Sequence, residues 1–338
     1  MSKLITHLTN LQYLISFTGT YGFMLLGPRK NVFFTDFRYR GFAEALEKSK
    51  TRIPFQFIEL NKDFEKTLKK LAGKTLEFEA NHLTVQELQN WKKRLKGVKF
   101  TPIKTPIETL RLIKNKEEIK NLKKSQEINE ETLKRIIKLF KNGVTEQELA
   151  WRIKTIGHDL GADDISFEPI IAFGPNSATP HHQNTNKKLK MGDMVLVDMG
   201  MKYKGYCSDM TRTFFTKTPT LEQETVYFKV LDAQMEAIKA LKAGVKCADL
   251  DKIARTSMGS DAEFFGHSLG HGIGLDVHES PGLSSRSKDI LKENEIVTVE
   301  PGIYLPGRFG VRIEDMGRVT KTGYENFTKF EKLAGWQG

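Results

Sequence analysis

Four acidic side chains lie inside apolar stretches in the second half of the chain, where carboxylates are unusual. Asp198 lies within Met194–Met199 (MVLVDM), an aliphatic run bounded by glycines that is typical of a β-strand, and Asp209 follows across the expected hairpin. Glu300 ends a similar run, and Glu314 lies in another. A buried anion is costly unless it is paired or metal-bound, and facing carboxylates raise each other's pKa unless cations lie between them. We therefore expect all four to bind metal, although a lone strand carboxylate more often lies on an exposed face.

The expected metal centre has five ligands, four carboxylates and one imidazole. They are Asp198, Asp209, His271, Glu300 and Glu314. This oxygen-rich set suits two divalent ions, with Mn²⁺ ahead of Co²⁺ or Fe²⁺, better than zinc held by thiolates, although Zn²⁺ stays an alternative. Two divalent ions against four carboxylates leave room for one bridging hydroxide. Ions about 3.5–4 Å apart can acidify that water and polarise a carbonyl, which indicates metal-assisted hydrolysis.

Two other motifs around His271 are weaker. His267 and His271 are four residues apart, as in a helical zinc motif, but Ser268 stands where that motif has glutamate, and the surrounding glycines discourage a helix. The glycines of GHGIG resemble a dinucleotide-binding loop, but the full strand-turn-helix pattern does not follow. We reject both interpretations.

The expected ligands lie in two similar halves of the chain. A helix, a Gly-Val pair, a second helix and then strands occur around Gly143 and again around Gly244, which we interpret as an internal repeat. Each half would contribute a strand pair to one central sheet, with the site between the halves. Thr145 and Glu148 predict a capping box. We expect helices at 116–141, 145–161, 220–243 and 248–258, and strands at 169–173, 194–199, 208–215, 296–304 and 311–320.

The first hundred residues predict a smaller α/β domain. Strands at 22–26, 31–35, 53–60, 75–79 and 98–100 alternate with helices at 36–46, 61–71 and 84–95, with Asn61 as an N-cap. The stretch TPIKTPIE (101–108), with two prolines, is the expected linker. We therefore predict an α/β (α+β) protein with an N-terminal domain at 1–108 and a C-terminal domain at 109–338.

Composition narrows the classes of protein. The 338-residue chain has a formal net charge of +11, but its lysines alternate with glutamates in helical stretches such as NKEEIKNLKK, so we expect solvated helix faces and no nucleic-acid partner. No stretch approaches the roughly 20 apolar residues that span a bilayer. The N-terminal residues lack the features of a signal peptide, and two cysteines suit a reducing compartment. We expect a cytoplasmic protein without membrane contact.

Six ordered motifs resemble the metal-dependent "pita-bread" peptidases, in particular the branch of Xaa-Pro aminopeptidases and prolidases. They are FGPNSATPHH (173–182), GDMVLVDMG (192–200), GYCSDMTRT (205–213), HSLGHGIGLDVHE (267–279), VEPGIY (299–304) and GVRIEDMG (310–317). The resemblance covers about residue 110 to the C-terminus, and TDFRYRGFAEA resembles the family's N-terminal domain more loosely. It implies a pita-bread C-terminal domain with a pseudo-twofold internal repeat. No ligand position departs from the family pattern.

The resemblance also implies a role for each ligand. Asp198 would hold the first metal ion through both oxygens. Asp209 and Glu314 would bridge the two ions, and His271 and Glu300 would complete the second. The nucleophile would be a metal-bridging hydroxide, and Glu300 would also take the proton of the nucleophilic water.

Three histidines and an arginine are expected around the substrate. His181 resembles the histidine that stabilises the tetrahedral intermediate or the leaving proline nitrogen, and His278 resembles one that contacts the substrate carbonyl. His267 resembles a residue that lines the proline pocket. Arg312 lies two residues before Glu314, and on a strand both would point to the same face. We expect Arg312 to pair with a carboxylate ligand or with the substrate.

The resemblance predicts a dinuclear metal-dependent exopeptidase that hydrolyses the Xaa-Pro bond at the N-terminus of peptides. A Xaa-Pro aminopeptidase is favoured over a Xaa-Pro dipeptidase (prolidase). A methionine-aminopeptidase-like enzyme is less favoured, because a separate N-terminal domain of about 100 residues argues against it. An inactive binding protein is less favoured because all five ligands are present. Its partners would be proline-containing peptides and, by family analogy, a second copy in a homodimer. His182 and Cys207 are interpreted as a loop neighbour and a small buried residue.

Overall fold

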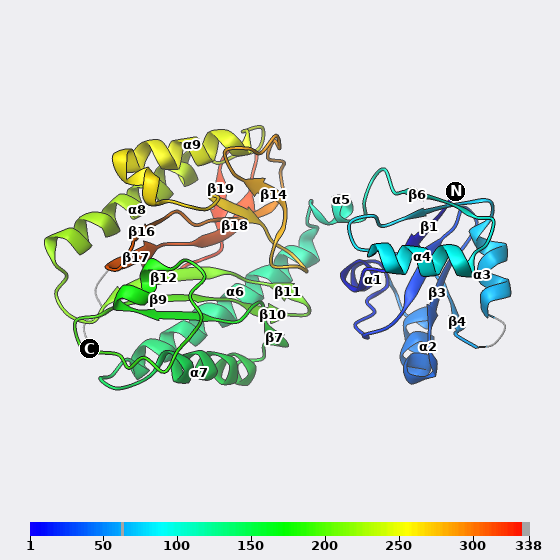
Figure 1. Ribbon diagram of the computed structural model, residues 1–338, viewed down its shortest axis with the longest axis horizontal. Coiled ribbons are helices and arrows are strands. Elements are labelled where there is room, and N and C mark those ends of the chain that lie inside the picture. The colour runs from blue at the N-terminus through cyan, green and yellow to red at the C-terminus, as the bar shows by residue number, and fades with distance from the viewer. Residues whose placement is uncertain (62–63, 333–338) are drawn as a thin grey trace. The chain divides into compact units, whose positions relative to one another are not determined.

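The computed structural model describes residues 1–61 and 64–332, and the chain divides into two compact units, Met1–Arg111 and Leu112–Gly338 (Figure 1). The mixed α/β fold class is confirmed, whereas the boundary after residue 108 stays a prediction. Of the helix expected at 61–71, residues 62–63 lie outside the described residues, and the described helix covers Phe64–Ala72. Among the described residues, none of the helices combines the length and apolar character needed to cross a membrane.

The first unit is built on a six-stranded mixed sheet in the order β4-β3-β2-β1-β5-β6. Its strands are β1 (Ser2–Ile5), β2 (Phe23–Leu26), β3 (Asn31–Thr35), β4 (Gln56–Glu59), β5 (Thr75–Phe78) and β6 (Lys99–Pro102). Its helices are α1 (Leu8–Ile15), α2 (Arg40–Lys48), α3 (Phe64–Ala72), α4 (Val85–Arg94) and α5 (Glu108–Arg111), with a 3₁₀ turn at Phe37–Tyr39. Leu4, Phe23, Phe34 and Leu76 form its core with Leu68 of α3. The sequence did not predict β1 or α1.

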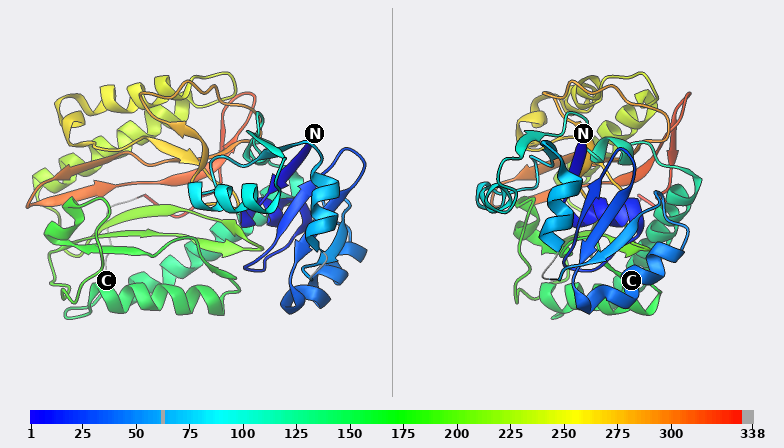
Figure 2. Two further views of the ribbon diagram at one scale, coloured as in Figure 1. Left: turned by 45° about the vertical axis from the view of Figure 1, so that its right-hand side comes forward. Right: turned by 90° about the vertical axis from the view of Figure 1, so that its right-hand side faces the viewer.

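The second unit has strands covered by helices on two sides, with α6 and α7 on one side and α8 and α9 on the other (Figures 1 and 2). The helices are α6 (Lys116–Ile136), α7 (Glu146–Asp159), α8 (Leu221–Ala240) and α9 (Cys247–Met258), with 3₁₀ turns at Ile137–Leu139, Gly174–Ala178 and Gly259–Phe264. The strands are β7 (Asp164–Ile165), β8 (Ile170–Phe173), β9 (Met194–Met199), β10 (Met201–Tyr203), β11 (Tyr206–Cys207), β12 (Met210–Phe215), β13 (Gly270–Gly272), β14 (Glu279–Leu283), β15 (Ile296–Val299), β16 (Gly302–Leu305), β17 (Phe309–Arg312), β18 (Asp315–Val319) and β19 (Tyr324–Asn326). They form sheets in the orders β11-β10-β7, β12-β9-β8, β14-β13-β15-β18-β19 and β16-β17.

Strand β9 places Asp198 by simple alternation of its side chains. Val195, Val197 and Met199 pack into an apolar cluster with residues of α6 and α7. Successive strand residues point to opposite faces, so Asp198 points away from that core. In the antiparallel ladder with β12, Asp198 lies opposite Thr211. The expected strand at 194–199 is thereby confirmed.

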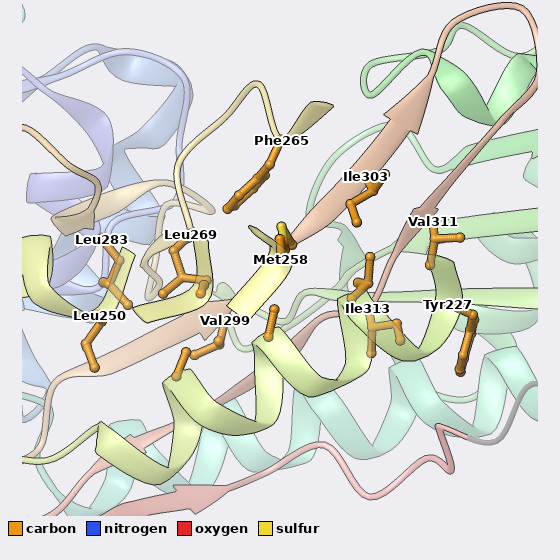
Figure 3. Packing of buried hydrophobic residues seen from close by; sticks show 14 of the residues in the cluster. Tyr227, Leu250, Met258, Phe265, Leu269, Leu283, Val299, Ile303, Val311 and Ile313 are labelled. Atoms are coloured by element: carbon orange, nitrogen blue, oxygen red, sulfur yellow. The ribbon is translucent and has the colours of Figure 1, made fainter. Parts of the chain in front are cut away.

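A second apolar cluster supports the strands of the later half. Val299, Ile303, Val311 and Ile313 are fully buried in one cluster with Tyr227 of α8 (Figure 3). The capping box predicted at Thr145 and Glu148 forms at the start of α7, and a second, which was not predicted, forms at the start of α8. Each half of the second unit therefore has its own core of helices packed on strands.

The strands expected at 296–304 and 311–320 are each divided in two, which corrects the predicted continuous strands. β15 pairs with β18, whereas β16 pairs with β17, so the chain changes partners between them. The backbone N–H of Glu300 donates to Leu269 O at 2.8 Å, and that of Glu314 donates to Thr211 O at 3.1 Å. Pro301 has no N–H to continue a ladder. Two predicted ligands therefore lie where the chain leaves one sheet for another.

Candidate active site

One cavity of about 550 Å³ in the second unit is lined by every side chain that the sequence predicts for the site. These are His181, Asp198, Asp209, His267, His271, His278, Glu300, Arg312 and Glu314. They come from segments between residues 181 and 314, and the fold brings them together. Phe167, Ile170 and Pro180, which the sequence did not single out, add apolar surface to the wall.

His271 is held close to the carboxylates by its flanking glycines. A Cβ on Gly270 would lie 2.1 Å from Thr298 O, and a Cβ on Gly272 would lie 2.2 Å from Ser280 O. Only glycine allows strands β14 and β15 to approach β13 so closely. The backbone N–H of His271 donates to Thr298 Oγ1 at 3.1 Å.

The imidazole of His271 faces two of the predicted ligands. Its Nε2 lies 3.6 Å from Asp209 Oδ2 and 3.3 Å from Glu300 Oε1, and Nδ1 lies 3.0 Å from Gly272 O. When Nδ1 carries the hydrogen, it donates to that carbonyl, and the lone pair of Nε2 faces the carboxylates. Donor atoms of Asp209, His271 and Glu314 all lie within 4.8 Å of one another.

Three buried carboxylate oxygens support cation binding at this place. Asp198 Oδ1, Asp209 Oδ1 and Glu314 Oε1 accept no hydrogen bond from the described residues. A buried carboxylate oxygen is otherwise almost always hydrogen-bonded. The group of oxygens and one imidazole nitrogen fits hard divalent ions.

When no cation is bound, burial and mutual repulsion raise the pKa values of three carboxyl groups in the site. Burial, followed by the negative charge of Glu314, raises the pKa of Asp209 well above its ordinary value. Burial raises the pKa of Glu300 to about 8, and burial with the charge of Glu300 raises the pKa of Glu314 well above its usual range. Burial also lowers the pKa of His271 to about 4, which keeps its imidazole neutral. Metal ligands in this state need cations to balance them.

Arg312 contacts a predicted ligand directly. Its guanidinium donates to Asp198 Oδ2 at 2.6 Å, to Tyr304 Oη at 2.8 Å and to Thr211 Oγ1 at 3.0 Å. Tyr304 Oη in turn lies 2.8 Å from Nε2 of His267. Of the two partners expected for Arg312, the structure shows the carboxylate ligand, and it links Asp198 to His267 through Arg312 and Tyr304.

Residues 120–321 match Metallopeptidase family M24, and residues 2–113 match the Creatinase/Prolidase N-terminal domain. The chain belongs to metallopeptidase family M24. The resemblance of the sequence to the pita-bread peptidases is therefore confirmed, and so is the pita-bread fold expected for the second unit of this M24 peptidase.

Solved and curated M24 relatives align along most of the chain. A Xaa-Pro dipeptidase from Bacillus anthracis is 36% identical with a TM-score of 0.93, over 98% of this chain and 94% of that chain. An X-Pro aminopeptidase from Thermotoga maritima is 33% identical with a TM-score of 0.90, over 98% of this chain and 96% of the other. A Xaa-Pro dipeptidase from Pyrococcus horikoshii is 35% identical over 289 residues, 85% of this chain and 82% of that relative.

A second group of metal-binding side chains lies in the N-terminal unit of this M24 peptidase. His7, His82 and Glu108 could reach one ion. However, the rings of His7 and His82 are stacked with centroids 3.7 Å apart and planes at 9°, and His82 Nε2 lies 2.5 Å from Glu108 Oε1. An ion in the plane of one ring would lie outside the plane of the other. Stacking and a hydrogen bond explain this cluster, so the cavity holds the better candidate site.

The sequence missed several side chains that hold the M24 site. Thr211 donates to Glu314 Oε2 at 2.8 Å, and Thr298 Oγ1 lies 3.3 Å from Glu300 Oε1. His182, interpreted as a mere neighbour, lies 2.9 Å from the buried Glu146, which corrects that interpretation. The hairpin register places Thr211 opposite Asp198, but the contact of Thr211 with Glu314 joins residues far apart in the chain and could not be found from local pattern. The contact between His182 and Glu146 likewise carries no local signal.

Proposed function

We propose that this M24 peptidase is a Xaa-Pro dipeptidase (prolidase) that uses two divalent metal ions, with Mn²⁺ preferred. The observation that carries the proposal is the single cavity lined by five metal-binding side chains together with His181, His267 and His278. The names of the relatives from B. anthracis and P. horikoshii favour a dipeptidase over the aminopeptidase expected from the sequence. The relative from T. maritima keeps the Xaa-Pro aminopeptidase as the second candidate.

The metal ligands in this proposal are the five that the sequence indicates: Asp198, Asp209, His271, Glu300 and Glu314. When bound, the ions would acidify a water molecule and polarise the scissile carbonyl. Glu300 would receive the proton that the attacking water loses, since its carboxylate lines the cavity beside the other ligands. Arg312 would keep Asp198 in position through its hydrogen bond at 2.6 Å.

The histidines would orient the substrate and stabilise charge. His181 and His278 would donate hydrogen bonds to oxygens that become negative, which lowers the barrier when the donors are already in place. The His278 ring lies 4.5 Å from the His271 ring, at the edge of the predicted metal ligands. Burial lowers the pKa of His267 to about 4, so its neutral ring would suit contact with an apolar group.

An apolar pocket answers a problem that is particular to proline. The Xaa-Pro amide has no N–H, so the enzyme cannot hold it by a hydrogen bond from that nitrogen. Shape recognition of the pyrrolidine ring by Phe167, Ile170 and His267 would replace that contact. Replacement of Phe167 or Ile170 by alanine should therefore weaken the preference for proline at the second position of the substrate.

The test is a direct comparison of two substrates. We expect the Mn²⁺-loaded protein to cleave Ala-Pro and Leu-Pro faster than Ala-Pro-Ala, measured as kcat/KM by chromatography of the free amino acids. Faster cleavage of the tripeptide would favour the Xaa-Pro aminopeptidase instead. Ala-Ala and Met-Ala-Ala serve as controls. Cleavage of Met-Ala-Ala without cleavage of any proline substrate would contradict both the dipeptidase and the Xaa-Pro aminopeptidase and favour a methionine aminopeptidase.

A homodimer and a cytoplasmic location stay predictions.

A further inference from the structure

Glu146 begins helix α7, and its carboxylate is completely buried. Glu146 Oε1 accepts hydrogen bonds from Phe173 N at 2.9 Å and Asn176 Nδ2 at 2.8 Å. Its Oε2 accepts from Thr185 N at 2.9 Å and Thr185 Oγ1 at 2.7 Å, and lies 2.9 Å from His182 Nε2. All five partners belong to the segment from residue 173 to residue 185, which we call the His181 segment.

The His181 segment carries His181, one of the side chains that line the cavity. Residue 181 lies immediately before His182, whose ring contacts Glu146, and immediately after Pro180. The carbonyl of Pro180 accepts from Arg312 Nη1 at 3.4 Å. Both chain neighbours of His181 are therefore held: His182 contacts the buried Glu146, and Pro180 accepts from Arg312. Arg312 itself binds Asp198.

The same segment is fixed from a third direction. Ser177 Oγ accepts from the backbone N–H of Gly310 at 2.9 Å. A Cβ on Gly310 would lie 2.1 Å from Ser177 O, so the backbones approach more closely than any other residue would allow. The segment is therefore held at several points, and Glu146 contacts five of its atoms.

A carboxylate suits this place because every partner is a hydrogen-bond donor. Burial alone would raise the pKa of Glu146, but hydrogen bonds from His182, Thr185, Phe173 and Asn176 outweigh it and lower the pKa below the ordinary value. The charged carboxylate also lies in the first turn of α7, where the helix dipole favours an anion. In either orientation, an amide at this position would turn its NH₂ group toward a backbone N–H, that of Phe173 or that of Thr185, which cannot accept a hydrogen bond.

We propose that Glu146 and His182 are positioning residues that hold the His181 segment so that His181 reaches the substrate at the metal site. This inference rests on the proposed function for its kinetic test, and on geometry alone for its structural test. Neither residue touches the substrate in this proposal. Both act through His181.

The kinetic test is a double-mutant cycle in the full-length, Mn²⁺-loaded protein. Glu146→Gln should lower kcat by about 10–100-fold, the range typical of residues that orient catalytic groups. Metal content and KM should change little. In a His181→Ala background, the same Glu146→Gln change should have almost no further effect, because the side chain that it positions is already absent. An equal loss in both backgrounds would contradict the inference and indicate general structural damage.

The matched control is Glu148→Gln, two residues later in the first turn of the same helix. Glu148 caps α7 through its hydrogen bonds with Thr145, is exposed, and has no hydrogen bond with the described residues of the His181 segment. We expect Glu148→Gln to lower the melting temperature slightly and to leave kcat unchanged. If Glu146→Gln does not fold, His182→Ala removes only the contacts of Nε2 with Glu146 and Asn176 and should show a smaller loss of kcat. His182→Gln should restore part of that loss, because its amide nitrogen can take the place of Nε2 and donate to Glu146.

The structural arm does not depend on the substrate. Phe173 N–H donates to one oxygen of Glu146 and Thr185 N–H to the other, so the glutamine of Glu146→Gln can accept from only one of them. Hydrogen exchange at the amide that faces the new NH₂ group should be at least ten times faster in Glu146→Gln than in the wild type, and exchange at both amides should be unchanged in Glu148→Gln. Unchanged exchange in Glu146→Gln would overturn the inference even if the enzyme is active. If the wild type cleaves no Xaa-Pro peptide but exchange accelerates as expected, the proposed function fails while the positioning of the segment stands.

Discussion

At the scale of single residues, burial and mutual repulsion favour protonation of three predicted ligands, whereas metal binding requires them to be ionised. These are Asp209, Glu300 and Glu314. Their burial beside one another raises the pKa of each in the metal-free protein, and for Glu300 the value is about 8. Arg312 places a positive charge beside a fourth predicted ligand, Asp198, with which it forms an ion pair. Bound divalent ions would remove the repulsion and allow all carboxylates to ionise together.

The raised pKa of Glu300 gives a stability prediction for the metal-free protein. A carboxyl whose pKa is about 8 when folded and about 4.5 when unfolded stabilises the fold fully below pH 4.5, and this contribution is lost as the pH rises to about 8. His267 and His271, with folded pKa values of about 4 and an ordinary value of 6.5, lose most of their effect on the slope above about pH 7.5. The melting temperature with chelator present should therefore fall between pH 7 and pH 8.5.

Calorimetry of wild type and Glu300→Gln at pH 7.0, 7.75 and 8.5 checks this prediction. The fall should be smaller in Glu300→Gln, because the amide does not ionise, and smaller in wild type loaded with Mn²⁺. Parallel slopes for the two proteins without metal would show that Glu300 does not titrate as we expect.

The close approach of strands β13 and β15 is the feature that matters most among the elements. Gly270 allows the backbone of β13 to pass against Thr298, and His271 follows it into the group of ligands. The neighbouring strand β14 has Gly282 opposite His271, but there a Cβ would meet nothing within 4 Å. The two glycines of one sheet therefore differ sharply in what they require.

Gly270→Ala should separate β13 from β15 and move His271 away from Asp209 and Glu300. We expect a loss of about 1–3 kcal/mol in the free energy of unfolding, typical of overpacking, and a loss of metal binding. Denaturant unfolding and elemental analysis after dialysis measure the two effects. Gly282→Ala is the control and should retain both stability and metal content; an equal loss in the two variants would mean that the close approach at Gly270 is not what positions His271.

Local pattern predicted some elements and could not predict others. The aliphatic run from 194 to 199 fixed both the strand and the face of Asp198, since one side of β9 packs on helices. The stretches 296–304 and 311–320 are predicted as unbroken strands, because period alone does not reveal that β15 and β16 pair with different partners. Tyr304 and Glu146 went unnoticed for a related reason: their importance lies in contacts with His267 and the His181 segment, which are distant in the chain.

Two large apolar clusters support the second unit, and the predicted metal ligands come from both halves of its chain. Asp198 belongs to the half whose core involves α6 and α7, and Glu300 and Glu314 belong to the half packed on α8 and α9. Ions bound by both sets would connect the halves and stabilise the folded state by mass action, about 2.7 kcal/mol when free metal is one hundred times its dissociation constant. The metal centre would thus be structural as well as catalytic.

The most direct measurement is anomalous diffraction at the manganese edge from crystals of the loaded protein. We predict two peaks inside the cavity, each within coordinating distance of carboxylates among Asp198, Asp209, Glu300 and Glu314, with His271 bound to one of them. No peak in the cavity under loading conditions, or peaks confined to His7, His82 and Glu108, would contradict the assignment of the metal site.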